Sequence, residues 1–369
     1  MRIGFDNDKY QKIQSEHIKE RISQFDGKLY LELGGKLFDD HHASRVLPGF
    51  LPDSKLRMFQ KISDSIEIVI VISATDIEKN KTRADLGITY DEDVIRLRSE
   101  FQNRGFMVGS VVITHYNGQP AAAAFRQRLE RDGIKTYCHY LIDGYPHDVK
   151  LIASDDGFGK NDFVETTRPL VIVTAPGPGS GKMAVCLSQL YNENKRGVRA
   201  GYAKFETFPV WNLPLKHPVN IAYEAATADL NDVNMIDPFH LEAYNKIAVN
   251  YNRDIEIFPV LKALFEGIYG YNPYKSPTDM GVNMVGFCIS DDEVCCEASK
   301  DEIVRRYYAA TNKLALGACN EAEVAKIRML FSQAGISTDF RRATVAAKEN
   351  LKATGHTSAA IELEDGTLI

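Results

Sequence analysis

The feature that constrains this chain most is a short apolar run that breaks into a glycine-rich turn and then a helical pattern, between Arg168 and Gly197. Leu170–Val173 is continuous and β-branched, which is typical of a strand buried in a parallel sheet. It leads into APGPGSGK, residues 175–182, where glycines let backbone N–H groups close around an anion and the lysine reaches its outer oxygens. This order of elements predicts a phosphate- or carboxylate-binding loop formed by Gly177, Gly179, Ser180, Gly181, Lys182 and Met183.

The match to the phosphate-loop motif G-x-x-x-x-G-K-[ST] is incomplete. Pro176 replaces the first glycine, and Met183 stands where a hydroxyl would normally hold Mg²⁺. A thioether does not replace that hydroxyl, so the sequence does not favour Mg²⁺ as a cofactor and makes ordinary ATP hydrolysis less expected. The alternative is a strand-to-helix turn that serves only packing.

Strand and helix patterns alternate upstream of this loop. Strands are expected at residues 67–73, 106–116 and 134–142, with helices at residues 91–105 and 120–133. Helices that alternate with apolar strands predict a doubly wound α/β domain with a mostly parallel sheet, over residues 1–270. Downstream of the loop, a further strand is expected at residues 219–223.

A second, helix-rich region is expected over residues 271–369. Capping-box patterns begin at Ser290, Ser299 and Asn320, each followed three residues later by a glutamate. The last residues, 359–369, resemble a strand, an Asp-Gly turn and the start of a return strand. We therefore expect this region to belong to a domain that continues beyond residue 369.

Ligands of doubly wound sheets bind at the carboxyl ends of the strands, so the residues just after each strand are the site candidates. The predicted catalytic residues are Lys182, Asp76, Lys204, Glu206 and Asp279. The predicted substrate contacts are Gly34, Gly35, Lys36, Thr278 and Asn283. A structural role is the more common one for a lone strand-end histidine such as His115, and a catalytic role is its alternative.

The adjacent acidic and histidine residues 39–42 raise the alternative of a metal site. Consecutive residues point to different sides of the chain and rarely converge on one ion. We therefore favour a polar loop or a subunit contact there, and we assign no metal ligands.

Composition narrows the set of partners. The net charge is -6 and no run of lysine and arginine exceeds two residues, so nucleic acid is not expected as a partner. No apolar run approaches the roughly 18 residues of a membrane span, so a cytoplasmic protein without a membrane partner is expected. The 6 cysteines form no C-x-x-C pair, which favours reduced, buried thiols. A homo-oligomer is compatible with this composition.

Several unusual strings together resemble one family of bacterial proteins, grouped as domain of unknown function 1846 and also called UPF0371. They are GGKLFDDHHASRVLPGF at 34–50, TAPGPGSGKMA at 174–184, AGYAKFETFPVWNLPLKHPVN at 200–220, AATADLNDVNMIDPFHLEAY at 225–244 and YKSPTDMGVNM at 274–284. Members of this family are longer, which implies a further C-terminal portion. The resemblance implies kinship and no particular activity.

Some members of the family have carried the label of ATP-dependent peptidase. This sequence contains neither H-E-x-x-H nor G-x-S-x-G, so we do not predict peptide hydrolysis. We predict that the chain binds a phosphate-bearing small molecule or a nucleotide, with phosphoryl transfer or chemistry on a phosphorylated metabolite as the candidate reactions. The alternative is a non-catalytic binding or oligomeric module whose glycine loop is only a packing turn.

Overall fold

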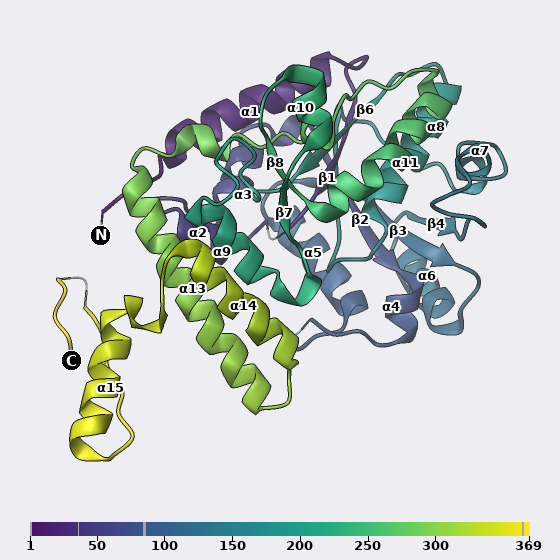
Figure 1. The fold of residues 1–369 in the computed structure, drawn as a ribbon. Helices are drawn as coiled ribbons and strands as arrows, with labels where there is room; N and C mark the ends of the chain where they lie inside the picture. Colours follow the sequence, from purple (N-terminus) through teal and green to yellow (C-terminus); the bar gives the residue numbers. More distant parts are fainter. Residues whose placement is uncertain (1, 36, 84–85, 364) are drawn as a thin grey trace.

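The computed structural model describes residues 2–35, 37–83, 86–363 and 365–369. Within these residues the central sheet has six strands in the order β4-β3-β2-β5-β1-β6, and every neighbouring pair is parallel (Figure 1). The strands are β1 Leu29–Leu33, β2 Ile66–Ser73, β3 Met107–Tyr116, β4 Thr136–Tyr140, β5 Leu170–Thr174 and β6 Gly201–Phe205. The parallel α/β sheet predicted from the sequence is confirmed.

The sheet is buried on both faces because its strands are apolar on both. In β2, Ile68, Ile70 and Ile72 face one core, while Val69 and Val71 face the other. Helices on the first face are α1 Asn7–Ser23, α3 Ser54–Gln60, α5 Tyr90–Asn103 and α6 Pro120–Arg131. Helices on the second face are α7 Val149–Ile152, α8 Lys182–Lys195 and α11 Asn252–Tyr269. Side chains of successive residues in one strand thus enter two different cores, as in other doubly wound folds.

The connections create a switch point beside β5. The chain runs outward through β2, β3 and β4, then returns to β5, which lies between β2 and β1. The loop after β5 and the loop after β2 therefore lead to opposite faces from neighbouring strands, the arrangement in which open α/β sheets bind ligands. The glycine loop lies at this switch point.

A third core joins segments that are distant in the sequence. Helices α2 His41–Val46 and α9 Pro218–Ala226 pack with α13 Asp292–Ala315 and α14 Glu321–Ala334. Asp291 caps α13 through the Val294 amide at 3.2 Å, and Asn320 caps α14 through the Glu323 amide at 3.0 Å. The expected strand at residues 219–223 is wrong, because Pro218 opens α9 at its first turn and its apolar residues pack in this core.

Shorter elements complete the chain. They are α4 Ala74–Glu78, α10 Pro238–Tyr244, α12 Pro277–Met280, α15 Arg342–Thr354, the antiparallel strands β7 Asn234–Ile236 and β8 Val249–Tyr251, and the 3-10 turns Ser63–Ser65, Phe158–Lys160, Ala228–Leu230, Val285–Cys288 and Thr338–Phe340. Among the described residues, no helix combines the length and apolar character that crossing a membrane would require.

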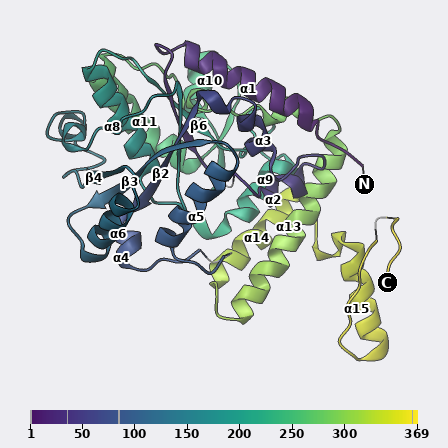
Figure 2. The same ribbon diagram turned by 180° about the vertical axis from the view of Figure 1, so that it is seen from behind.

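Helix α15 and the residues after it project from the rest of the molecule in both ribbon views (Figures 1 and 2). None of its described residues is buried. Near the end, the Leu363 amide donates to the Thr367 carbonyl at 2.8 Å, as the expected chain reversal requires. The division of the chain at residue 270 stays a prediction, while residues 285–334 share a core with residues 5–50.

Amide hydrogen exchange tests the separation of α15 from the cores. We expect α15 amides to exchange much faster than those of α13, whose buried residues include Ile303 and Val304. Exchange followed by mass spectrometry on the full chain measures both helices in one experiment, with α13 as the internal control. Equal protection of the two helices would contradict this account.

Candidate functional site

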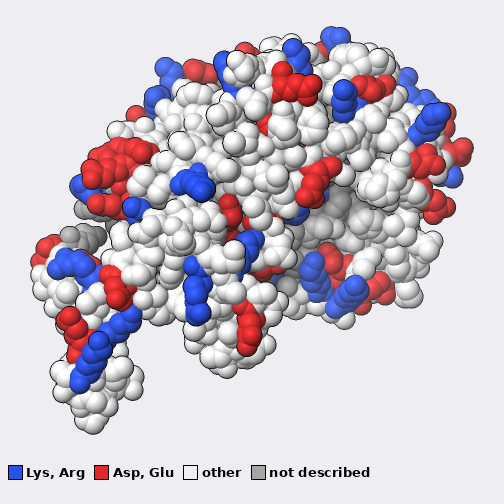
Figure 3. Space-filling model, in the orientation of Figure 1, with Lys and Arg blue, Asp and Glu red and all other residues white. Residues whose placement is uncertain are grey.

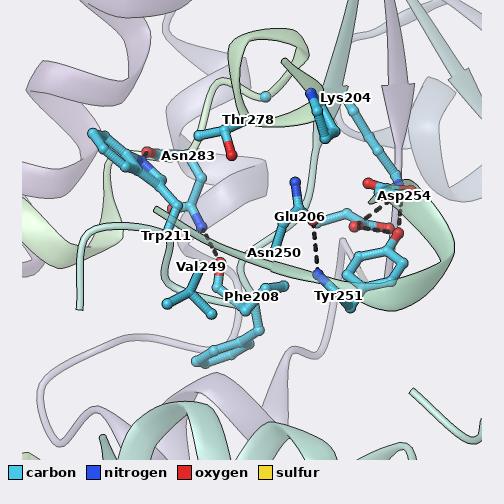
Figure 4. Close-up of a pocket in the computed structure, with 13 residues that line it drawn as sticks. Lys204, Glu206, Phe208, Trp211, Val249, Asn250, Tyr251, Asp254, Thr278 and Asn283 are labelled. Carbon is cyan, nitrogen blue, oxygen red and sulfur yellow. Dashed lines mark hydrogen bonds and ion pairs between the residues drawn. The ribbon is translucent and has the colours of Figure 1, made fainter. Parts of the chain in front are cut away.

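A pocket of ≈ 50 Å³ lies where β6 ends, at the carboxyl edge of the sheet (Figure 4). Its walls come from β6 and the segment after it, from β8 and the start of α11, and from the segment 277–283. The labelled lining residues are Lys204, Glu206, Phe208, Trp211, Val249, Asn250, Tyr251, Asp254, Thr278 and Asn283. Four of the predicted site residues therefore meet in one place: Lys204, Glu206, Thr278 and Asn283.

The segment 277–283 reaches the pocket by pairing with the free edge of β6. Val282 donates its amide to the Lys204 carbonyl at 3.1 Å, and Gly281 forms a parallel bridge with Lys204. Residues separated by more than seventy positions are thereby held side by side at the end of one strand. The spacing of motifs in the sequence could not have predicted this pairing between β6 and the segment 277–283.

Lys204 anchors a buried network of charges. Its ammonium lies 2.7 and 2.9 Å from the two carboxylate oxygens of Asp254 and 3.3 Å from Oε2 of Glu206. The Tyr251 hydroxyl also contacts this ammonium and donates to Glu206 Oε2 at 3.0 Å. Burial alone would lower the pKa of Lys204, but the surrounding carboxylates, Asp254 first, raise it above its ordinary value. Lys204 is therefore a fixed cation and not a proton donor near neutral pH.

Glu32 belongs to the same network, although the sequence did not single it out. It lies on β1 next to β6, is only 8% exposed, and accepts the Tyr202 hydroxyl at 2.7 Å. The signal that could have found it is a single carboxylate inside the apolar strand LYLEL. Glu32, Glu206 and Asp254 give three carboxylates around one lysine.

The surroundings of Glu206 shift its pKa. Burial, followed by the charges of Asp254 and Glu32, raises its pKa above the ordinary value, and Lys204 opposes this shift. Its side chain lies over Gly34, where an added Cβ would overlap the carboxylate. Gly34 thus leaves space for an acidic side chain at the end of β1.

Thr278 and Asn283 already have protein partners. The Thr278 hydroxyl donates to Asp237 at 2.6 Å, and the Asn283 amide donates to the Thr207 carbonyl at 2.8 Å. Asp279 does not line the pocket, and its carboxylate accepts the Tyr244 hydroxyl at 2.9 Å. These contacts hold the segment 277–283 in place against α10 and the chain after β6.

The glycine loop lies two strands away, after β5. Gly179 and Gly181 have φ of +76° and +87°, which side chains disfavour, and the Thr114 hydroxyl donates to the Ser180 carbonyl at 2.6 Å. The Ser180 hydroxyl is buried and bonds no described residue. Lys182 opens α8 without a hydrogen bond or ion pair to another described residue.

Other parts of the loop are filled by protein. The Tyr90 hydroxyl lies where a Cβ on Gly177 would be, and Met183 packs against the core beneath α8. Gly35 has a φ of +70° and an added Cβ there would meet open space, while Lys36 lies outside the described residues. The predicted contributions of Gly35 and Lys36 therefore remain predictions.

Asp76 follows β2 and His115 lies near the end of β3, on the opposite side of the glycine loop from the pocket. Asp76 is paired with Lys81 at 3.2 Å, and the His115 ring lies 3.1 Å from the Ser73 hydroxyl. Burial lowers the pKa of His115, although Asp76 acts in the other direction. His115 also has a φ of +52°, an uncommon conformation for a side chain of this size. The structure does not bring these residues together with Lys204 and Glu206.

The acidic and histidine residues 39–42 serve the fold. Asp40 caps α2 through the Ala43 amide at 3.1 Å, pairs with Lys55 at 2.8 Å, and accepts the Thr207 hydroxyl at 3.0 Å. His42 lies 3.6 Å from Glu302 on α13. Asp40 and His42 thus contact different elements of the fold.

Among the described residues, the one group with the spacing of metal ligands is His217, Asp292 and Cys296. His217 Nδ1 accepts the Val219 amide at 3.3 Å, so Nε2 carries the ring proton and donates to Asp292 at 2.9 Å. A nitrogen that carries a proton offers no lone pair to a metal. His217 therefore serves as the N-cap of α9 and is held in place by its hydrogen bond to Asp292.

Charged residues of both signs are interspersed over the face of the molecule seen in Figure 3. The face seen in Figure 3 is thus not uniformly acidic. Single substitutions of Lys204 and Glu206 should show how the charges around Lys204 affect the free energy of unfolding.

Replacing Lys204 by methionine removes the cation that faces the buried carboxylates of Asp254 and Glu32 and the partly buried one of Glu206. We expect Lys204→Met to lower the free energy of unfolding by about 3–5 kcal/mol, the range for a broken buried ion pair. Urea unfolding measures this change. Lys262→Met, on the exposed side of α11, is the matched control and should change stability little. A loss no larger than that of the control would show that the network does not stabilise the fold.

Replacing Glu206 by glutamine tests the direction of its pKa. Because the folded-state pKa lies above the ordinary 4.5, the stability that protonation adds is complete below that value and is lost as pH rises through the folded-state pKa. The free energy of unfolding of the wild type minus that of Glu206→Gln should therefore fall as pH rises from about 4.5. Urea unfolding across this pH range measures the difference, and a rising difference would contradict the assignment.

Comparison with known sequences places the chain among bacterial relatives. A family model described as "Domain of unknown function DUF1846, N-terminal" matches residues 3–335. The UPF0371 protein of Corynebacterium urealyticum is 58% identical over 368 residues, covering 100% of this chain and 74% of the relative. UPF0371 proteins of Streptococcus pyogenes serotype M5 and Streptococcus thermophilus are 57% identical, each with 74% of its length covered. The chain belongs to the DUF1846 family, whose curated relatives are the UPF0371 proteins.

Proposed function

We propose that this chain binds a phosphate-bearing small molecule or a nucleotide, with a phosphate group at the N-terminus of α8. The observation that carries the proposal is Lys182, a cation that opens a helix at the switch point of the sheet and has no hydrogen bond or ion pair with another described residue. The buried Ser180 hydroxyl beside it also bonds no described residue.

The geometry of the loop suits an anion. The first amides of a helix have no partner within the helix and carry about half a positive charge between them. Gly179 and Gly181 have left-handed backbone conformations of the kind found in anion-binding loops, and Pro178 and Gly179 are exposed to solvent at this point of the chain. An anion at this point would also neutralise the ammonium of Lys182.

The acidic pocket offers chemistry within reach of a bound phosphate. Strands β5 and β6 are separated by β1, so their ends lie roughly 10 Å apart at the usual spacing between strands. A metabolite bound by its phosphate at α8 would extend across β1 toward Glu32 and Glu206. The raised pKa of Glu206 suits a general acid, and this supports a reaction on a phosphorylated metabolite more than Mg²⁺-dependent hydrolysis.

A specific observation supports the alternative of a packing turn. Tyr90 fills the space beside Gly177, so one side of the loop is occupied by protein. If this holds for the whole loop, the module is non-catalytic and Lys182 is an ordinary surface lysine. The two proposals differ in what the Lys182 substitution does.

The test is a thermal-shift panel of nucleotides and sugar phosphates with the wild type and Lys182→Ala. We expect a phosphorylated ligand to raise the melting temperature of the wild type and to bind Lys182→Ala about ten- to a hundredfold more weakly, since a hydrogen bond to a charged group contributes about 1.5–3 kcal/mol. The control Lys262→Ala changes an exposed lysine on α11 and should bind like the wild type. No shift with any ligand, or equal binding by both variants, would favour the packing turn.

A further inference from the structure

We propose that the pocket at the end of β6 is a subsite for the end of a ligand that has a primary ammonium group on one carbon and an oxygen acceptor on the next carbon. Vicinal amino alcohols and the head groups of amino acids have this chemistry. The inference goes beyond the phosphate site, because it rests on other residues and does not require a ligand at α8.

The first argument is the balance of charge around the pocket. The Lys204 ammonium is held by both oxygens of Asp254 and lies near Glu206, and Glu32 is the register partner of Lys204 on the neighbouring strand. The next cation, Arg253, is already paired with Asp232 at 2.6 Å. Buried carboxylates in excess of their cations are costly, so a second cation in the pocket would be stabilised.

The second argument is the aromatic lining. Phe208, Trp211 and Tyr251 line the pocket, and the Trp211 indole N–H donates to the Asn283 carbonyl at 2.8 Å, which fixes the ring as a wall. The ring of Tyr251 already lies 4.6 Å from the Lys204 ammonium. Aromatic faces attract desolvated ammonium groups, and together with a carboxylate they select a cation over a neutral group of the same size.

The third argument is an unused donor. Asn250 is 9% exposed, and its Oδ1 accepts the Tyr251 amide at 2.9 Å. Its Nδ2 bonds no described residue, and in Figure 4 it points away from Tyr251 into the pocket. This donor is accessible from the pocket, where a hydroxyl or carboxylate oxygen next to the ammonium would accept its hydrogen bond.

The size of the pocket limits the ligand group. At ≈ 50 Å³ it holds about three or four water molecules, which is room for an ammonium group, one oxygen and the carbons between them. The subsite thus receives the end of a ligand and not its body.

The test compares two small probes of nearly equal shape, ethanolamine and ethylene glycol, with ligand-detected NMR on the full chain. We expect ethanolamine to bind the wild type and Glu206→Gln to bind it roughly tenfold more weakly, because the bound ammonium favours the ionised form of Glu206 and glutamine cannot supply that charge. Glu242→Gln, an exposed position on α10, is the matched control and should bind like the wild type. Equal affinity of the two probes, no detectable ethanolamine binding, or no effect of Glu206→Gln would overturn the proposal.

Two further variants separate this subsite from its neighbours. Asn250→Ala should weaken ethanolamine binding but not the binding of ethylamine, which lacks the hydroxyl. Lys182→Ala should leave ethanolamine binding unchanged, whatever it does to phosphate binding, so the two proposals fail independently. An equal loss for both amines in Asn250→Ala, or a loss of ethanolamine binding in Lys182→Ala, would contradict the assignment of the ammonium to this pocket.

Discussion

The contact between the Lys204 ammonium and the Asp254 carboxylate joins the parts of the molecule that form the pocket. Lys204 is the last residue but one of the edge strand β6, and Asp254 lies in the first turn of α11, which covers the second face. The backbone of Lys204 also bonds the segment that follows α12. One residue therefore fixes a strand, a helix and a loop with respect to each other, and the pocket exists because these three are held together.

The parallel sheet determines where this contact can form. All strands end at the same edge, so polar residues just after an apolar strand gather there regardless of their distance in the sequence. The two candidate sites share this edge but differ in charge. The start of α8 presents backbone amides and a lysine, whereas the end of β6 presents carboxylates and aromatic rings. A ligand that used both would carry a negative group at one end and a positive group at the other.

The sequence predicted the elements around the glycine loop well because their patterns are local. Continuous β-branched runs at β2 and β5, and helices that end in glycine such as α8, give signals that tertiary contacts do not override. The strand predicted at residues 219–223 was wrong because the local pattern alone did not decide the type of element. Its apolar residues suit a strand or a buried helix, and the choice depended on Pro218 and on packing against α13.

The sequence by itself determined the parallel α/β class, the carboxyl edge as the place to search, and four of the residues that line the pocket, because hydrophobic periodicity and strand ends are properties of neighbouring residues. The tertiary structure decided which candidates meet. It brought Glu32, Asn250 and Asp254 to Lys204 and Glu206, placed Asp76 beyond the glycine loop, and gave Thr278 and Asn283 partners within the protein. Pairing between a strand edge and a distant loop, and the burial of a charge among carboxylates, are interactions between segments whose approach only the folded chain defines.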